Sequence, residues 1–307
     1  MLDRSNEIQR FLKASGWGDA ASTALAGDMS TRRYFRLKQG RVSAILMDAD
    51  TSMAPFLAMT EWLAQLDLSV PQVFAAEPDD GLLILEELGD VTVKKALSDR
   101  LCTDEDIFAG CVDILLRIRR AEPPPLQEPS AKELVAWTEL ADHQLPGVKP
   151  NALDAFRSHL LTILSDVIAG TATVSLRDFH TENMMWLPDR QGCRKFGLLD
   201  YQDAILTHPA YDLMSLLTDA RTWVPGELRR AVVAQYLQKS GDDRDQFELA
   251  FAALSAQRNL RIMGLFARSG KHLECLPNTY RYFIEALDHP AFEQIKTATI
   301  GAVPQPT

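Results

Sequence analysis

Cysteine is scarce in this sequence, and the spacing of the cysteines matches no metal-binding or redox motif. The cysteines lie far apart and show no C-x-x-C pattern, so we expect reduced thiols in the core and neither disulfides nor a zinc site. They are Cys102, Cys111, Cys193 and Cys275. Long apolar runs are also lacking, since no stretch approaches the roughly 20 apolar residues of a membrane span. The N-terminus, MLDRSNEIQRFLKASGWG, is polar and typical of an amphipathic helix. These absences predict a cytoplasmic protein that does not associate with membranes.

Positive charge is in short supply as well. The chain has 42 acidic and 32 basic residues, and its formal net charge is -10. Composition therefore excludes nonspecific binding to nucleic acid or anionic membranes, and an anionic ligand must be held by a local set of cations. The 307 residues, 46% of them apolar, suffice for two domains or one large bilobal unit. No obligate protein partner is indicated.

The hydrophobic pattern changes character near Gly89. Before it, residues 34–38, 42–47 and 82–85 read as strands, and residues 53–66 as a helix. After it, helical patterns cover residues 104–120, 130–143, 151–169, 209–220, 227–239 and 245–267. We predict an α+β fold in which a small N-terminal antiparallel sheet lobe, residues 1–88, precedes a larger helical lobe, residues 89–307. The hinge is expected near residues 86–89.

The segment SLRDFHTEN, residues 175–183, places Asp178 and Asn183 five positions apart. Alone this spacing is weak, since chance supplies about one match in a chain of this length. The following residues strengthen it: strand candidates at 184–187 and 196–199 flank a turn, and the second strand ends at Asp200. Strands of nearly equal length predict a hairpin that returns Asp200 to the end where Asn183 lies.

These three side chains suit phosphoryl transfer from ATP. The reaction needs a carboxylate that orients the acceptor hydroxyl and accepts its proton, and oxygen ligands for Mg²⁺. We therefore predict Asp178 as the catalytic residue and Asn183 and Asp200 as magnesium ligands, with ATP as the donor. In the alternative interpretation, Asp178 and Asn183 only cap a turn and Asp200 only ends a strand.

On these residues the chain resembles the aminoglycoside phosphotransferase and choline kinase superfamily, relatives of the protein kinases. Their catalytic loop carries D-x-x-x-x-N, and their metal-binding aspartate follows on the next hairpin. The resemblance covers almost the whole chain and implies a bilobal protein-kinase-like fold. Leu176 stands where protein kinases have the His of H-R-D, while His180 is common in the small-molecule branch. The resemblance thus implies a small-molecule acceptor.

The resemblance also implies where the nucleotide binds. The turn AGDMSTRRYFR, residues 26–36, occupies the phosphate-covering position but has one glycine and no G-x-G-x-x-G. Backbone amides near Ser30 and Thr31 and the guanidinium groups of Arg32 or Arg33 are suited to phosphate oxygens, although a solvated basic turn is the alternative. The hinge would bind adenine through backbone groups of residues 86–88. These are Glu86, Glu87 and Leu88.

One expected cation is missing from the strand that corresponds to V-A-I-K. The strand reads VSAILMD, residues 42–48, with Met47 where the lysine is expected. We infer that Arg32 or Arg33 replaces that lysine. Glu61, the usual lysine partner, would then face water or pair with an arginine. The loss also leaves open a noncatalytic pseudokinase that binds nucleotide.

Several longer segments are similar to a narrower group, the bacterial anomeric sugar kinases. These phosphorylate the C1 hydroxyl of N-acetylmuramate and N-acetylglucosamine during cell-wall recycling. The segments are GD-x-S-x-RRYFR, LMDA, LLILEELGD, RDFHTEN, LLDYQDA, YDLMSLL-x-DAR and QRNLRIMGLFAR. The similarity implies an amino sugar acceptor, with an aminoglycoside or another hydroxyl compound as the alternative.

Polar side chains around these motifs are candidates for binding the acceptor. Tyr201, Gln202 and Asp203 directly follow Asp200, which places hydrogen-bonding groups where a polyol needs them. Asp219 and Arg221 could meet the sugar or each other, and Arg258 could meet a carboxylate, a phosphate or a structural ion-pair partner. The substrate-binding candidates are His180, Gln202, Asp203, Asp219, Arg221 and Arg258. Asp212 is expected to brace the catalytic loop by accepting backbone hydrogen bonds.

Overall fold

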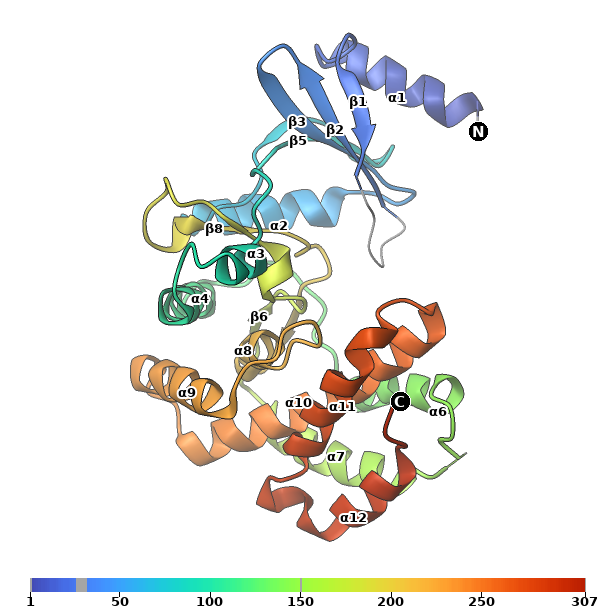
Figure 1. Ribbon diagram of the computed structural model, residues 1–307, viewed down its shortest axis with the longest axis vertical. Coiled ribbons are helices and arrows are strands. Elements are labelled where there is room, and N and C mark those ends of the chain that lie inside the picture. Colours follow the sequence, from blue (N-terminus) through green and yellow to red (C-terminus); the bar gives the residue numbers. More distant parts are fainter. Residues whose placement is uncertain (1, 26–31, 150, 307) are drawn as a thin grey trace. The chain divides into compact units, whose positions relative to one another are not determined.

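The computed structural model describes residues 2–25, 32–149 and 151–306, and these fall into two compact units (Figure 1). The first unit comprises Met1–Thr92 with Met184–Gln202, and the second comprises Val93–Asn183 with Asp203–Thr307. The lobe division expected at residues 88 and 89 stays a prediction. Among the described residues, no helix combines the length and apolar character that crossing a membrane requires.

A five-stranded antiparallel sheet forms the body of the first unit. The strand order is β1-β2-β3-β5-β4. The strands are β1 (Ala21–Ala24), β2 (Arg33–Gln39), β3 (Val42–Asp48), β4 (Val73–Glu77) and β5 (Leu82–Glu86), and the helices are α1 (Leu2–Ala14) and α2 (Ala54–Gln65). The first four residues of β5, a strand that pairs with both β3 and β4, are all buried, which explains its continuous apolar run. The predicted strands at 34–38, 42–47 and 82–85 are confirmed.

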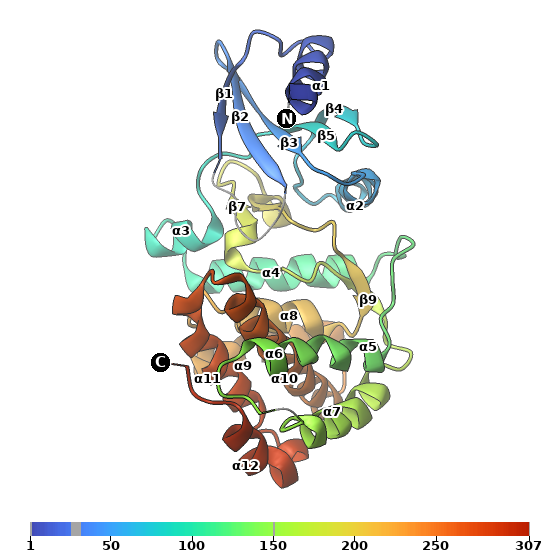
Figure 2. The ribbon, with the colours of Figure 1, turned by 90° about the vertical axis from the view of Figure 1, so that its right-hand side faces the viewer.

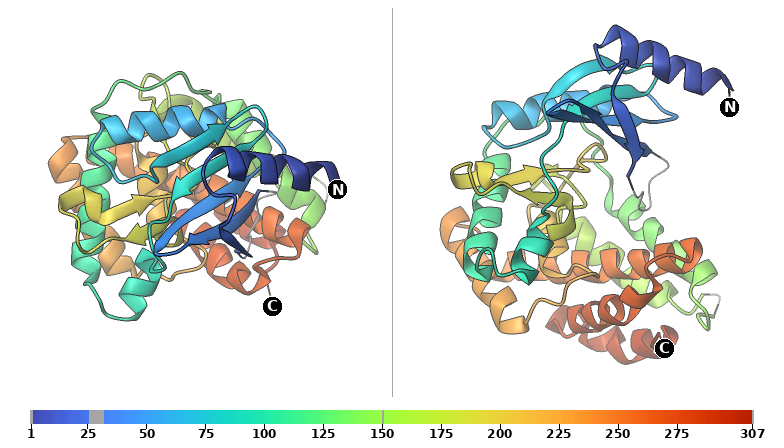
Figure 3. Two further views of the ribbon diagram at one scale, coloured as in Figure 1. Left: turned by 90° about the horizontal axis from the view of Figure 1, so that it is seen from above. Right: turned by 45° about the horizontal axis from the view of Figure 1, so that its top comes forward.

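Helix α1 covers one face of this sheet (Figure 3). Its Phe11 and Leu12 pack in one cluster with inward residues of three strands. Those residues are Leu37, Ala44, Leu46, Leu82 and Ile84. Alternate residues of a strand point to one face, so the apolar alternation of β2 and β3 determines which face α1 covers.

The predicted hairpin is also confirmed and belongs to the first unit. Strand β7 (Met184–Trp186) pairs antiparallel with β8 (Phe196–Leu198), and Met184 lies opposite Leu198. The Leu198 amide donates a 2.8 Å hydrogen bond to the Ser69 carbonyl. Gly197 permits this close packing, since a Cβ there would lie 2.7 Å from Cδ1 of Leu88.

Helices dominate the second unit. Strand β6 (Thr173–Ser175) pairs with β9 (Ile205–Thr207). The helices are α3 (Val93–Ser98), α4 (Asp104–Arg119), α5 (Ala131–Ala136), α6 (Leu140–Gln144), α7 (Asp154–Val167), α8 (Ala210–Leu217), α9 (Gly226–Ser240), α10 (Arg244–Ser269), α11 (Leu276–Ala286) and α12 (Glu293–Ala302). Helix α10 packs against α6, α7, α8 and α11 and forms the centre of this unit (Figure 2).

Local signals explain both ends of α10. The Asp243 side chain accepts a 2.9 Å hydrogen bond from the Gln246 amide, which caps the N-terminus. Gly270 ends the helix with a left-handed φ of 67°, a conformation that glycine adopts without steric cost. The helix predicted at 245–267 therefore needs only small extensions at each end.

Gly264 lets α10 approach α6 closely. A Cβ at this position would lie 2.8 Å from the amide nitrogen of Ala141 and 2.9 Å from the carbonyl carbon of Leu140. We expect Gly264→Ala to lower the free energy of unfolding by about 1–3 kcal/mol, because the two backbones must separate. Denaturant unfolding measures the change.

Gly301→Ala is the matched control, since a Cβ at this exposed position in α12 would meet no atom within 4 Å. Alanine is the better helix former by up to about 1 kcal/mol, so this variant should be as stable as the parent or more stable. Equal stability of Gly264→Ala and Gly301→Ala would contradict the close approach of α10 and α6.

Candidate functional site

The buried carboxylate of Asp212, in the first turn of α8, braces the catalytic loop. It accepts hydrogen bonds from Ser175 Oγ (2.7 Å), the Leu176 amide (2.6 Å) and the Arg177 amide (3.0 Å). The predicted brace is thus confirmed. Burial raises the pKa of Asp212 to about 6, while these three donors oppose the rise. At neutral pH the carboxylate is therefore ionised and remains an acceptor for all three donors.

The loop that follows brings Asp178 and Asn183 together. Arg177 adopts a left-handed φ of 67°, and the Asp178 amide donates to the Leu176 carbonyl at 2.9 Å. Asn183 Nδ2 then donates to the Asp178 carbonyl at 3.0 Å. This bond uses the amide nitrogen of Asn183 and turns its oxygen, the atom that a magnesium ion would need, away from that carbonyl.

Positive charges surround the Asp178 carboxylate. Its side chain is 49% exposed, and Nη2 of the buried Arg258 lies 3.4 Å from Oδ1. Burial alone would raise the pKa of Asp178, but the positive charges of Arg258, Arg177 and Arg261 together lower it below the ordinary value. Asp178 is therefore ionised at neutral pH and able to accept a hydrogen bond from a hydroxyl group.

Asp200 belongs to the first unit, where it follows β8 with a left-handed φ of 57°. Gln202 Nε2 donates to Asp200 Oδ1 at 2.7 Å, and Arg32 Nη1 lies 3.6 Å from the same oxygen. Tyr201 instead turns into the core, where its ring stacks on Phe56 at 5.2 Å. The expectation that Tyr201 faces the acceptor is therefore wrong, because α2 provides an aromatic partner for it.

The two arginines expected at the phosphates have different partners. Arg33 Nη2 lies 2.5 Å from Oδ2 of the buried Asp48, whose other oxygen pairs with Arg4 at 2.6 Å. Arg32 is the arginine that lies beside Asp200. Met47, which stands where the lysine is expected, is buried in the sheet. Ser30 and Thr31 lie outside the described residues.

The three residues predicted to bind adenine contact other parts of the protein through their side chains. Glu86 pairs with Arg190 at 2.7 Å, and Glu87 pairs with Arg36. Leu88 is buried and packs at the Gly197 position. Their predicted role at adenine concerns backbone groups and stays a prediction. Glu61 is exposed on α2, as expected for a solvated charge.

Three of the six substrate candidates gather in the second unit. Arg221 Nη1 donates to Nε2 of the buried His180 at 3.4 Å, and the Arg221 amide donates to Oδ1 of the buried Asp219 at 3.1 Å. Glu182 pairs with Arg221 at 2.8 Å and with Lys94 at 2.6 Å. Sequence reasoning missed Glu182 and Lys94, although Glu182 lies inside the catalytic motif.

The other three candidates make different contacts, and of these Asp203 and Arg258 also belong to the second unit. Gln202 belongs to the first unit and contacts Asp200, while Asp203 presents its carbonyl oxygen to Arg177 Nη1 at 3.3 Å. Arg258 contacts Asp178. These contacts orient the catalytic loop and its neighbours.

Two buried polar atoms of this group have no hydrogen-bond partner within the described part of the chain. They are His180 Nδ1 and Asp219 Oδ2. Burial lowers the pKa of His180, so its ring is neutral at pH 7 and has one donor and one acceptor nitrogen. Because buried polar atoms are nearly always hydrogen-bonded, these two suit the hydroxyl or amide groups of a ligand.

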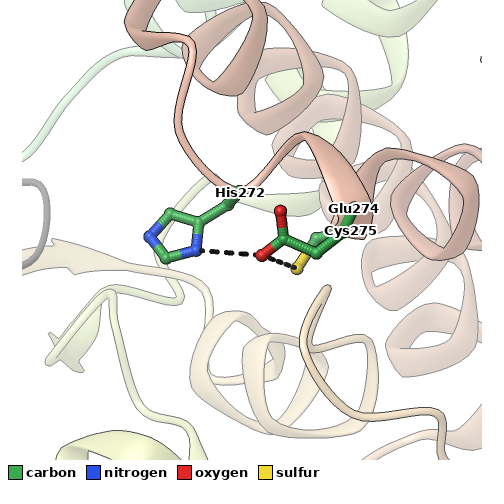
Figure 4. Close-up of side chains that lie close together, drawn as sticks. All are labelled: His272, Glu274 and Cys275. Carbon is green, nitrogen blue, oxygen red and sulfur yellow. Dashed lines mark hydrogen bonds and ion pairs between the residues drawn. The ribbon is translucent and has the colours of Figure 1, made fainter.

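A turn before α11 supports the loop that carries Asp219 and Arg221. His272, Glu274 and Cys275 lie together there, with Glu274 Oε1 3.7 Å from His272 Nδ1 and 4.0 Å from Cys275 Sγ (Figure 4). Cys275 packs with Ala220. Burial raises the pKa of the Cys275 thiol, which disfavours the thiolate that metals bind. We therefore assign this cluster a packing role.

Comparison with known proteins identifies the family. The family model described as "Phosphotransferase enzyme family" matches residues 22–250. The chain belongs to this family. A protein from Caulobacter vibrioides named N-acetylmuramate/N-acetylglucosamine kinase is 33% identical, and the match covers 93% of each chain. A protein of the same name from Pseudomonas putida is 26% identical over 92% of this chain and 88% of its own.

The fold is that of the choline kinases and their relatives. The choline kinase LicA from Streptococcus pneumoniae matches with a TM-score of 0.66 at 14% identity, over 94% of this chain and 99% of the other. LicA in complex with AMP also matches, with a TM-score of 0.64. The predicted bilobal kinase-like α+β fold is confirmed by these structures. The predicted enzyme class, a nucleotide-dependent phosphotransferase with an alcohol acceptor, is confirmed by the family match and the kinase relatives.

The Asp212 brace can be tested by Asp212→Asn. An asparagine has one acceptor oxygen, so its NH2 group would face either the Leu176 amide, which donates to Oδ2, or the Arg177 amide and the Ser175 hydroxyl, which donate to Oδ1. We expect the loop to shift and turnover to fall about 100-fold, the scale of a misplacement near 1 Å. Steady-state kinetics with thermal unfolding measure both effects.

Ser175→Ala is the graded control, because it removes one of the three donors and leaves both backbone bonds in place. Its loss of turnover should be much smaller than that of Asp212→Asn. Full activity in Asp212→Asn would show that the loop holds its geometry without the brace.

Proposed function

We propose that this protein is a Mg²⁺- and ATP-dependent kinase that phosphorylates the anomeric C1 hydroxyl of N-acetylmuramate, N-acetylglucosamine or both. The observation that carries the proposal is the 33% identity to a kinase named for these two sugars across 93% of both chains. The ionised, braced Asp178 supports the same reaction class. A cytoplasmic location fits free cysteines and the use of ATP.

In this mechanism Asp178 orients the acceptor hydroxyl. The sugar oxygen attacks the γ-phosphorus, the bond from that phosphorus to the bridging oxygen breaks, and ADP leaves. Because the pKa of Asp178 is low, the hydroxyl proton passes to the carboxylate only as the new P–O bond forms and the hydroxyl becomes acidic. The main contribution of Asp178 is thus to fix the direction of attack.

Asn183 and Asp200 would hold magnesium. One amide oxygen and one carboxylate match the preference of this ion for oxygen ligands and leave positions for phosphate oxygens and water. When bound, the ion neutralises charge on the phosphates. Gln202 supports this role because its amide keeps Asp200 oriented.

Arg32 would supply the phosphate-binding charge that Met47 cannot. Its 3.6 Å approach to Asp200 supports Arg32 over Arg33, which pairs with Asp48. Backbone groups near Ser30 and Thr31 would contribute further donors. Backbone groups of residues 86–88 would bind the adenine ring.

His180 and Asp219 would bind the sugar. Nδ1 of the neutral His180 ring and Oδ2 of Asp219 are buried and have no hydrogen-bond partner in the described part of the chain. Both atoms suit hydrogen bonds with the hydroxyl or acetamido groups of a sugar. The arginines around Asp178 disfavour a polycationic aminoglycoside, because bringing like charges together weakens binding.

The acceptor can be identified by measuring ADP release from Mg-ATP. The panel contains N-acetylmuramate, N-acetylglucosamine and kanamycin, with an acceptor-free control. We expect release that depends on at least one of the two sugars and none that depends on kanamycin. Release with kanamycin alone, or with no compound of the panel, would reject the proposed acceptor.

Asp178→Asn tests the catalytic role. The amide keeps the shape of the side chain but cannot accept a proton, so kcat should fall about 10²- to 10⁴-fold. ATP binding, measured by calorimetry, should stay close to that of the parent. Asp166→Asn, at an exposed position of α7, is the control and should keep full turnover. Unchanged kcat in Asp178→Asn would remove this residue from the mechanism.

A further inference from the structure

Two arginines near Asp178 stack on one tryptophan. Trp137 lies in the short helix η1 (Trp137–Glu139), Arg177 in the catalytic loop and Arg261 in α10. The central guanidinium carbon of each arginine lies 5.2 Å from the centroid of the Trp137 ring. Cation–π contact of this kind fixes a guanidinium plane, and its edge N–H groups remain available to a ligand.

The charge of this group is unbalanced. The positive charges of Arg258, Arg177 and Arg261 all act on Asp178, and Arg258 makes the direct contact with it at 3.4 Å. Arg177 donates from Nη1 to a carbonyl, and its buried Nε has no partner in the described part of the chain. Arg261 forms no ion pair with any residue that the structure describes.

The surroundings of Arg261 sharpen this imbalance. Burial lowers the pKa of Arg261, and the neighbouring charges of Arg177 and Arg258 lower it further. Asp178 and the buried Tyr211 act in the opposite direction. Partly buried cations that outnumber their carboxylates are stabilised when an anion binds.

We propose that Arg177 and Arg261, held on Trp137, bind the carboxylate of an acidic acceptor sugar and so favour N-acetylmuramate over N-acetylglucosamine. The inference rests on the proposed function. N-acetylmuramate carries a lactyl carboxylate on O3 that N-acetylglucosamine lacks, and a planar guanidinium binds a carboxylate through two parallel hydrogen bonds.

A phosphate group of the nucleotide has similar anionic chemistry. The acceptor is favoured because Trp137, Arg177 and Arg261 all belong to the second unit, as do His180 and Asp219. The residues proposed for the nucleotide, Arg32 and the hinge, belong to the first unit. The test therefore compares acceptors at saturating ATP and also measures KM for ATP.

Arg261→Gln is the central variant. We expect kcat/KM for N-acetylmuramate to fall about 10- to 100-fold, the effect of losing a charge-assisted hydrogen bond, mainly through KM. The value for N-acetylglucosamine should fall by a clearly smaller factor, and KM for ATP should stay the same. Arg268→Gln, at an exposed position of the same helix, should leave the ratio between the two sugars unchanged.

Arg261→Lys is the second variant and guards against a general loss of folding. Lysine keeps the charge but not the planar fork, so it should restore part of the preference for N-acetylmuramate. Equal losses for both sugars in Arg261→Gln, or a raised KM for ATP, would overturn the inference while the parent still phosphorylates sugar. A parent enzyme that uses neither sugar would overturn the proposed function and this inference with it.

Discussion

The hydrogen bonds to Asp212 are the constraint on which the catalytic loop depends. One buried carboxylate accepts hydrogen bonds from the hydroxyl of Ser175 and the amides of Leu176 and Arg177. These bonds hold Arg177 in a left-handed conformation, which costs a non-glycine residue roughly 1–2 kcal/mol. The turn presents Asp178, and the bond from Asn183 to its carbonyl closes the loop. A buried residue of α8 thereby determines where the carboxylate of Asp178 lies.

The second theme is local positive charge in an acidic protein. The formal net charge is -10, yet the region around Asp178 holds three arginines and a neutral histidine. These cations keep Asp178 ionised and suit the region to an anionic ligand. In the first unit Arg32 lies at Asp200, while the position of the usual kinase lysine is filled by the buried Met47. The proposed phosphate-binding role of Arg32 would supply the charge that Met47 lacks.

Short-range sequence patterns predicted several strands and helices correctly. Features that depend on contacts between residues distant in the chain could not be predicted from such patterns. The apolar run of β5 and the hairpin of β7 and β8 follow from periodicity and turn residues, and Asp212 follows from its motif. The helix expected at 130–143 is interrupted at Trp137–Glu139, where the side chain of Arg157 bonds to Thr138 and Asp142.

Helix α11 was not predicted, and its Pro277 lies at the start of the helix, where proline is tolerated. The stacking of two arginines on Trp137 joins residues far apart in the chain, so no local pattern reveals it. Phosphorus NMR of the purified product tests the central claim most directly, because it identifies the hydroxyl that receives the phosphoryl group. Our account predicts a phosphomonoester signal coupled to the anomeric proton of the sugar. A phosphoester on any other hydroxyl, or ATP bound without a phosphoester product, would contradict it.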